Sequence, residues 1–264
     1  MKENSPYIDI HTHRRAPLEG VITVSNYAQK DVFTEGPTLA TIGLHPWFLT
    51  RENFDHDFEK MTQLVKNQKV MGIGECGLDK LRGEDLAFQT TVFEAQIRLA
   101  ETVSKPIIIH CVRAFSEIIA IKKRLKPSIP MIIHGFNKNE TVLKELLRHG
   151  FFISIGAAIL PKKRAYSLEK VENVIARHEA TAGTSFSKMM QQIPLDRLFF
   201  ETDDADDVSI YDVYQAASEI LKIDLRNLKS IIYENYKTLF RNYNPIIVLS
   251  LLDTDQNRVQ RFGG

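Results

Sequence analysis

Two histidines separated by one residue, His11 and His13, follow a short apolar run near the start of the chain. If residues 7–13 form a β-strand, side chains alternate between its faces, so Asp9, His11 and His13 share one face. Two imidazoles on one face of a strand can bind a single metal ion together. We therefore predict that His11 and His13 bind metal and that Asp9 orients one of them.

Further ionisable residues stand at the ends of other apolar runs. These residues are His45, Glu75, His110, His134, Glu201 and Asp203. Five of the eight histidines of the chain fall at such ends, which a random scatter would rarely produce. Imidazoles combined with carboxylates suit divalent cations such as zinc, manganese or iron.

The residue types indicate how the side chains would be shared between two metal ions. Glu75 can bridge both because a carboxylate has two oxygens, and His110 and His134 would complete the second ion. Asp203 can bind metal and also accept a proton from water, whereas Glu201 is open to metal binding or to a hydrogen bond with a loop. Two ions about 4 Å apart activate water and stabilise the leaving oxygen of a displacement at phosphorus.

Eight short apolar segments must position these residues. The expected strands are 7–13, 20–27, 38–45, 69–76, 105–112, 130–136, 151–158 and 197–204, and the expected helices are 53–67, 85–104, 113–126, 139–150, 185–193 and 210–222. Several strands are continuously apolar, as parallel strands buried on both faces are. The alternation predicts an α/β fold, a TIM-type (β/α)8 barrel whose strand ends converge on one mouth.

The pattern departs from a regular barrel in places. Too few residues separate the first two strands for a helix, and 28–37 is also loop-like, so the early units are trimmed. The stretch 160–185 is longer than a loop needs; we interpret it as a solvated insertion with an extra helix and a basic cluster, Lys162, Lys163 and Arg164. Residues 225–243 form a helix that packs on the barrel. The pattern predicts a single domain, 1–264.

Composition is that of an ordinary globular protein, with a formal net charge of +1, and demands neither nucleic acid nor an anionic membrane as partner. No apolar run approaches the roughly 20 residues that span a bilayer, and the first residues lack a signal-peptide apolar region. Cys76 and Cys111 are too few for a disulfide framework or a zinc finger, so we interpret both as packing residues. We expect a cytoplasmic protein with no membrane contact and no obligate protein partner.

Seven motifs stand in order along the chain: DIHTH (9–13), IGLHP (42–46), GIGECGLD (72–79), KPIIIHC (105–111), IIHGF (132–136), ISIGAAI (153–159) and LFFETD (198–203). Together they resemble the TatD family of metal-dependent deoxyribonucleases, over about Tyr7 to Tyr243. The resemblance implies a barrel of the amidohydrolase superfamily that hydrolyses phosphodiesters. It also implies metal ligands at His11, His13, Glu75, His110, His134 and Asp203, with His45 near the substrate phosphate.

The chain departs from the family pattern around these ligands. Arg14 and Arg15 stand where the family has a Leu-Asp pair, and Arg113, which we assign to substrate binding, is shifted by one position from the family arginine. The motif after the last strand continues with extra acidic residues, which would repel a polyanion if they face the mouth: Asp204, Asp206 and Asp207. The motifs therefore indicate the metal ligands more closely than they indicate the substrate.

We expect a divalent-metal phosphodiesterase, a DNase acting on strand ends, with Glu75 and Asp203 as catalytic residues. Its cofactor would be one or two ions of zinc, manganese or magnesium, and its substrate DNA or a small phosphodiester. One alternative is an amidohydrolase-type enzyme on a small substrate, although many such relatives carry a carboxylated lysine where Glu75 stands. Another is a non-catalytic barrel scaffold, against which the full ligand set argues.

Overall fold

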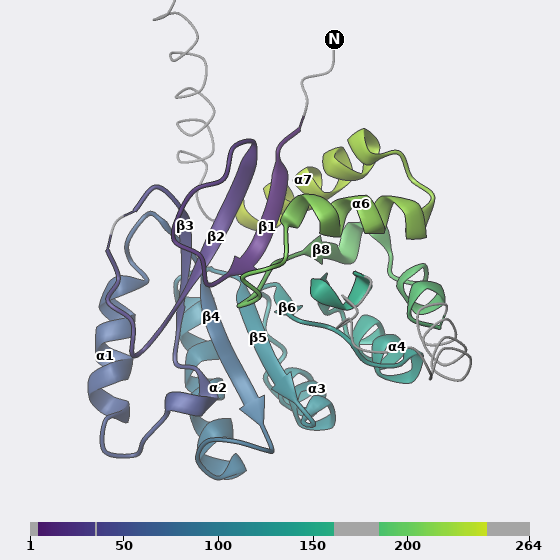
Figure 1. Cartoon of the computed structure of the whole chain (residues 1–264). Helices are drawn as coiled ribbons and strands as arrows, with labels where there is room; N and C mark the ends of the chain where they lie inside the picture. Colours follow the sequence, from purple (N-terminus) through teal and green to yellow (C-terminus); the bar gives the residue numbers. More distant parts are fainter. Residues whose placement is uncertain (1–4, 35, 161–184, 242–264) are drawn as a thin grey trace, which may run out of the picture.

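Eight parallel strands pair in sequence order in the computed structural model, which describes residues 5–34, 36–160 and 185–241. The strands are β1 (Tyr7–Thr12), β2 (Val21–Ala28), β3 (Leu39–Gly43), β4 (Val70–Asp79), β5 (Ile107–Val112), β6 (Met131–Ile133), β7 (Phe152–Ile155) and β8 (Leu198–Phe200). A bridge between Thr12 and Asp203 links β1 to the end of β8. The sheet is thus a nearly closed barrel, as predicted (Figure 1).

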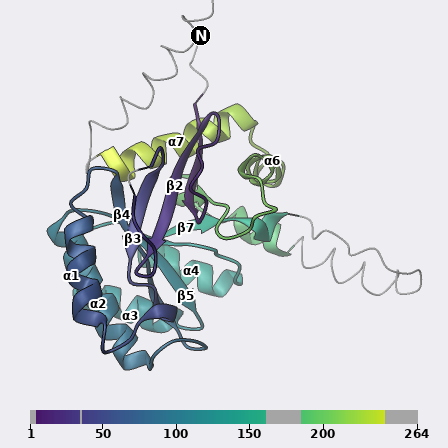
Figure 2. The same cartoon turned by 60° about the vertical axis from the view of Figure 1, so that its left-hand side comes forward.

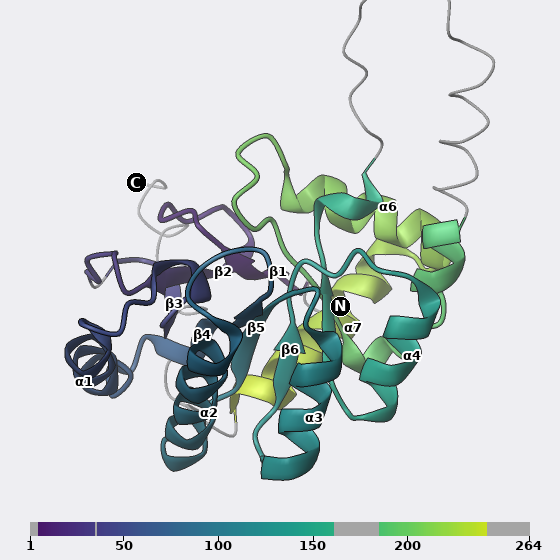
Figure 3. The same cartoon turned by 90° about the horizontal axis from the view of Figure 1, so that it is seen from below.

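The helices surround the strands on the outside. Besides helical residues at 185–190, they are α1 (Phe54–Leu64), α2 (Leu86–Thr102), α3 (Phe115–Leu125), α4 (Glu140–Arg148), α6 (Ile210–Leu221) and α7 (Leu225–Arg241), with short 3-10 helices η1 (Pro46–Phe48), η2 (Ala157–Ile159) and η3 (Leu195–Arg197). Figure 3 shows α2, α3 and α4 in order along one flank. Helices α6 and α7 contact each other and pack against β1 and β8 (Figure 1). Figure 2 shows α6 on the side of the barrel away from α1.

Burial on both faces explains the apolar runs of the strands. All ten residues of β4 are buried, because α2 covers its outer side and the barrel interior covers the other. Helix starts follow local chemistry: the side chain of Asn139 caps α4 by accepting a hydrogen bond from the Val142 amide, and Asp85 caps α2 through the Phe88 amide. These caps fix where each helix leaves the mouth of the barrel.

The trimmed early units are confirmed, since no helix stands between β1 and β2 or in the described residues between β2 and β3. Three strands end three or four residues earlier than predicted: β6, β7 and β8 have only three or four residues, so the polar residues that follow lie in loops. Strand β4 instead runs on to Asp79. The predicted helix at 225–243 is present as α7, as far as the described residues go.

Some predictions reach beyond the residues that the structure describes. The insertion at 160–185, with Lys162, Lys163 and Arg164, lies almost wholly outside them. The single domain 1–264 therefore stays a prediction, although the described part forms one barrel. Within that part, no helix combines the length and the apolarity needed to cross a bilayer.

Candidate metal centre

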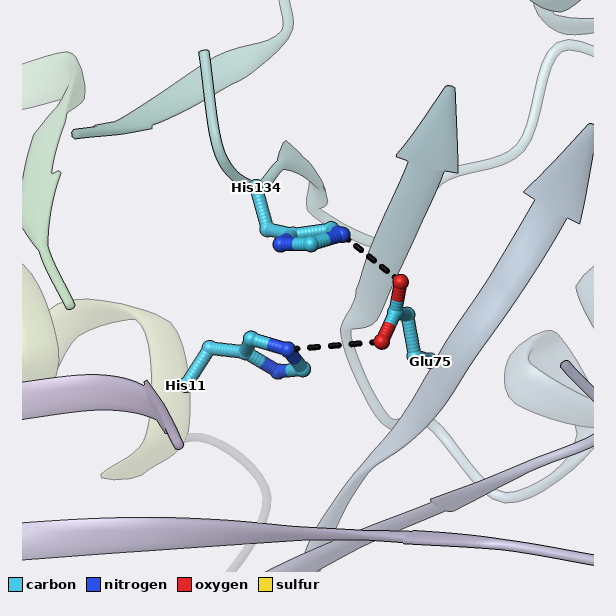
Figure 4. Close-up of side chains that lie close together, drawn as sticks. All are labelled: His11, Glu75 and His134. Atoms are coloured by element: carbon cyan, nitrogen blue, oxygen red, sulfur yellow. Dashed lines mark ion pairs between the residues drawn. The ribbon is translucent and has the colours of Figure 1, made fainter. Parts of the chain in front are cut away.

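Glu75 stands at the centre of the barrel mouth, and its two carboxylate oxygens face different histidines. Oε2 lies 3.4 Å from Nε2 of His11 and 3.8 Å from Nε2 of His13. Oε1 lies 2.6 Å from Nδ1 of His110 and 2.7 Å from Nε2 of His134. Figure 4 shows His11 and His134 approaching Glu75 from different segments, each toward its own oxygen. One buried carboxylate therefore serves two sets of imidazoles.

Asp203 completes the set on the Oε2 side. Its Oδ1 lies 3.4 Å from Nε2 of His11 and 3.7 Å from Nε2 of His13. Two backbone hydrogen bonds of 3.0 Å hold it there, from the Asp203 amide to the His11 carbonyl and from the His13 amide to the Asp203 carbonyl. These contacts between the end of β1 and the residues after β8 form the seam between β1 and β8. The seam positions both histidines and the carboxylate.

His45 faces the other oxygen of Glu75 but differs in its chemistry. Its Nδ1 accepts a hydrogen bond from the Trp47 amide at 3.1 Å, so the ring proton belongs on Nε2 when the imidazole is neutral. That Nε2 lies 3.1 Å from Oε1 of Glu75. Burial lowers the pKa of His45, which favours this neutral form. His45 is therefore a hydrogen-bond donor at the centre.

Asp79 belongs to the same site, a residue to which the sequence interpretation gave no role. Its Oδ2 accepts a 2.6 Å hydrogen bond from the indole Nε1 of Trp47 and lies 3.1 Å from Nε2 of His110. Burial opposes its charge, but hydrogen bonds, first from Trp47 and then from the Leu81 amide, lower the pKa of Asp79 overall. Glu75 and Asp79 share a strand face because they are four positions apart, and this alternation was the signal that could have identified Asp79.

Asp9 does not orient a histidine as predicted. Its Oδ1 accepts a hydrogen bond from the Thr202 amide at 3.0 Å, and its Oδ2 accepts one from the Thr202 hydroxyl at 2.7 Å. Both carboxylate oxygens are therefore bound to the residue before Asp203, because β8 closes the barrel beside β1. Asp9 supports the seam that holds Asp203.

Glu201 lies behind His134. Its Oε1 accepts a 2.6 Å hydrogen bond from the Gly135 amide and lies 3.5 Å from Nδ1 of His134. The loop hydrogen bond, one of the two roles open from the sequence, is therefore present. The carboxylate also faces the imidazole on the side away from Glu75, an arrangement that orients metal-binding histidines in proteins.

Arg113 and the two cysteines stand apart from this cluster. Arg113 is exposed just after β5 with a φ of 55°, so its predicted role in substrate binding stays a prediction. Cys76 is fully buried with Sγ 3.8 Å from the Ile108 carbonyl oxygen, and burial raises the pKa of Cys111 to about 12. Neither thiol is in a state that favours reactivity.

Arg14 and Arg15 act within the protein. The guanidinium of Arg14 donates hydrogen bonds to the carbonyl oxygens of Ala205 at 2.9 Å, Asp206 at 3.1 Å and Val208 at 2.6 Å. The guanidinium of Arg15 lies 3.8 Å above the ring of Tyr27. Arg14 therefore fixes the acidic loop that follows Asp203.

The donor set fits divalent metal ions. Both ring nitrogens of His11, Nδ1 of His134 and Oε2 of Glu201 are buried without a hydrogen-bond partner in the described residues. Such buried polar atoms are costly unless something binds them, and an ion bound at Nε2 of His11 would satisfy it. The grouping of His11, His13 and Asp203, and that of His11, Glu75 and His134, each bring three ligand atoms within 4.8 Å of one another.

Comparison with known proteins shows to which family the chain belongs. A model of the TatD related DNase family matches residues 15–241. The chain belongs to this family. Among curated TatD relatives, the 3'-5' ssDNA/RNA exonuclease TatD of Edwardsiella piscicida is 30% identical over 166 residues, which cover 62% of this chain and 56% of that protein. The chain thus spans little more than half the length of the curated TatD exonucleases it matches.

Other relatives align over more of their length. An uncharacterized metal-dependent hydrolase of Mycoplasma genitalium is 29% identical over 222 residues, 76% of this chain and 77% of that protein. The crystal structure of a TatD family hydrolase from Entamoeba histolytica has a TM-score of 0.68 at 18% identity, covering 89% of this chain and 98% of the other. A TatD homologue from Escherichia coli gives 0.67 at 21% identity with the same coverage. These two structures show that the fold is the TatD barrel.

Proposed function

We propose that this TatD family member hydrolyses phosphodiester bonds in nucleic acid, using one or two divalent metal ions. The observation that carries the proposal is the position of Glu75, whose two oxygens face two separate sets of imidazoles. The family match and the exonuclease names of the relatives support a nucleic-acid substrate, with single-stranded DNA as the first candidate. The amidohydrolase and scaffold alternatives receive no comparable support.

If two ions bind, the two sets of side chains would divide between them. His11, His13, Asp203 and Oε2 of Glu75 would hold one, and Oε1 of Glu75 with His110 and His134 would hold the other. When bound, such ions lower the pKa of water and stabilise negative charge on a phosphoryl oxygen. Zinc, manganese and magnesium are the candidate metals, since the site mixes nitrogen and oxygen donors.

The residues of the chain supply proton transfer and orientation. Burial opposes the charge of Asp203, but His11, whose Nε2 lies 3.4 Å from Oδ1, and the charge of His134 lower the pKa of Asp203 to about 2. Asp203 is therefore a carboxylate at neutral pH and can accept a proton from the attacking water. His45 can share its Nε2 proton between Glu75 and a phosphate oxygen, and Arg113 offers a guanidinium at the end of β5.

An activity screen tests the proposal. The protein is stripped of metal, reloaded with zinc, manganese or magnesium, and assayed on single-stranded DNA, RNA, duplex DNA and amide substrates. Glu75→Gln and Asp203→Asn should each lower nuclease activity at least about a hundredfold, as loss of a metal ligand and proton acceptor does. Asp196→Asn, an exposed carboxylate in η3 at the other end of the barrel, is the matched control and should stay near wild type.

Two outcomes would contradict the proposal. Amide hydrolysis without phosphodiester hydrolysis would favour the amidohydrolase alternative. Absence of bound metal by elemental analysis, together with inactivity on every substrate, would favour the scaffold. The cytoplasmic location is likewise a proposal, for which cell fractionation is the test.

A further inference from the structure

Two aromatic rings beside the metal centre each lie under an exposed cation. Both rings belong to η1: Trp47, the only tryptophan of the chain, is 36% exposed, and Phe48 is half-buried. The guanidinium carbon of Arg82 lies 4.1 Å from the Trp47 ring centroid, and Nζ of Lys30 lies 4.0 Å from the Phe48 centroid. The loops after β2 and β4 therefore each bring a positive charge onto the same short segment.

In the part of the chain that the structure describes, neither cation is neutralised by a nearby carboxylate. Asp31, next to Lys30 in sequence, pairs with Arg15, and Glu84, near Arg82, pairs with Arg51. No ion pair of Lys30 or Arg82 occurs within residues 5–34, 36–160 and 185–241. Their charge is thus available to an anion at the mouth of the barrel.

The loop that carries Arg82 is held firmly against η1. The side-chain amide of Gln89 donates hydrogen bonds to the carbonyl oxygens of Arg82 at 3.1 Å and Glu84 at 2.6 Å. Gly83 has a φ of 89°, and a Cβ there would lie 2.3 Å from the Pro46 carbonyl oxygen. Only glycine permits this approach, so the sequence itself fixes the loop over the indole.

The indole is also connected to the metal centre. Its Nε1 donates to Asp79, which in turn contacts His110, and its ring centroid lies 5.4 Å from that of His110 and 5.0 Å from that of His45. A phosphate that reached the Oε1 side of Glu75 would therefore bring its own nucleoside beside Trp47.

We propose that Trp47 stacks on the base of the nucleotide adjacent to the cleaved bond, while Arg82 and Lys30 contact neighbouring phosphates. The inference rests on the proposed nuclease function and specifies how the substrate is held. Single-stranded nucleic acids bind to aromatic platforms flanked by cations, and every base has a face to stack. Because Arg82 is exposed, its guanidinium can leave the indole for a phosphate and open that ring face to a base.

The distribution of charge around the barrel mouth determines over which loops the nucleic acid lies. The loop after β8 carries three exposed carboxylates, Asp204, Asp206 and Asp207, whereas the loops after β2 and β4 carry two cations that have no ion-pair partner among the described residues. Strand β8 lies four strands from β4 around the barrel. A polyanion is therefore directed over η1 and away from the acidic loop.

Fluorescence of the single tryptophan tests the stacking directly. Metal-free protein, kept in chelator so that no cleavage occurs, is titrated with a short oligothymidylate and with an abasic strand of the same length. Stacking predicts saturable quenching by the oligothymidylate and about tenfold or more weaker binding of the abasic strand. Equal quenching by both strands, or no quenching by either, would overturn the inference.

Metal-loaded protein provides a second test, the ratio of kcat/KM for a thymidine-containing end to that for an abasic end. Trp47→Ala should lower this ratio about 10- to 100-fold, and Trp47→Phe should restore most of it. Arg82→Gln should reduce the salt dependence of binding, by about 0.7 in the slope of log Kd against log salt concentration for each lost phosphate contact. Equal losses on both substrates in Trp47→Ala would contradict base stacking.

Arg197→Gln is the matched control, since that guanidinium lies 5.4 Å from the Phe152 ring centroid at the opposite end of the barrel. It should leave the ratio and the salt slope unchanged. The two proposals fail separately: base-dependent quenching without hydrolysis contradicts only the nuclease function, and hydrolysis without quenching contradicts only the role of Trp47.

Discussion

One oxygen of Asp79 joins two different parts of the site, since Oδ2 accepts the indole hydrogen bond of Trp47 at 2.6 Å and lies 3.1 Å from Nε2 of His110. Trp47 at the barrel mouth and His110, a proposed metal ligand, are therefore oriented by the same carboxylate. A change at Asp79 should alter both.

Asp79→Asn should weaken binding at the Oε1 side of Glu75 about 10- to 100-fold, because the carboxylate that orients His110 loses its charge. Titration calorimetry should show one of two metal-binding events weakened and the other retained. Trp47 emission should shift in the same variant. Glu59→Gln, an exposed carboxylate on α1, is the control; equal weakening of both binding events would contradict the assignment.

Added metal should stabilise the wild-type protein, because a ligand that binds only the folded state raises its stability by about 2.7 kcal/mol at a hundredfold excess over Kd. For a chain of this size the melting temperature should rise on the order of 5 °C. Glu75→Gln, measured by differential scanning calorimetry, should show a much smaller rise. An unchanged rise would show that the ions bind elsewhere.

Arg14→Ala should destabilise the loop after β8, because three carbonyl oxygens lose a charged donor. We expect a loss of about 1–3 kcal/mol in urea unfolding and faster amide exchange over residues 204–208. Arg15→Ala, whose partner Asp31 is on the surface, should cost less than about 1 kcal/mol. The reverse order of the two variants would refute this role for Arg14.

Lys105 should make stability depend on pH at the far end of the barrel from the site. Its Nζ donates to the carbonyl oxygens of Val65 and Val70, and burial lowers its pKa to about 8 from an ordinary value of 10.5. Because the folded state loses this proton more easily than the unfolded state, its contribution to stability should rise between pH 8 and pH 10.5.

Urea unfolding at pH 7.5 and pH 9.5 measures this contribution as a difference between wild type and Lys105→Met. The wild type should gain stability relative to the variant as the pH rises. A constant difference at both pH values would contradict the lowered pKa.

Much of this arrangement follows from the sequence because parallel strands of one barrel bring their carboxyl ends together. The strand order predicts that His11 in β1 and His134 after β6 lie close together, although 123 positions separate them in the sequence. Alternation along β4 would also have predicted Asp79. These features depend on periodicity and topology alone.

Other features depend on loop geometry that no periodicity encodes. Asp9 has the predicted strand face, but its partner Thr202 comes from the far end of the chain. The proton position on His45 depends on the turn of η1, which brings the Trp47 amide to Nδ1. Arg14 contacts three backbone carbonyls, and backbone groups have no signature in residue identity.

The seam between β1 and β8 has a consequence for how the protein is made. Thr12 and Asp203 lie 191 positions apart, yet the backbone around them aligns His11, His13 and Asp203. A ribosome releases β1 long before β8. The histidines of β1 therefore have no Asp203 carboxylate beside them until nearly the whole chain has been synthesised. The centre is therefore assembled last, and only a completed barrel acquires it.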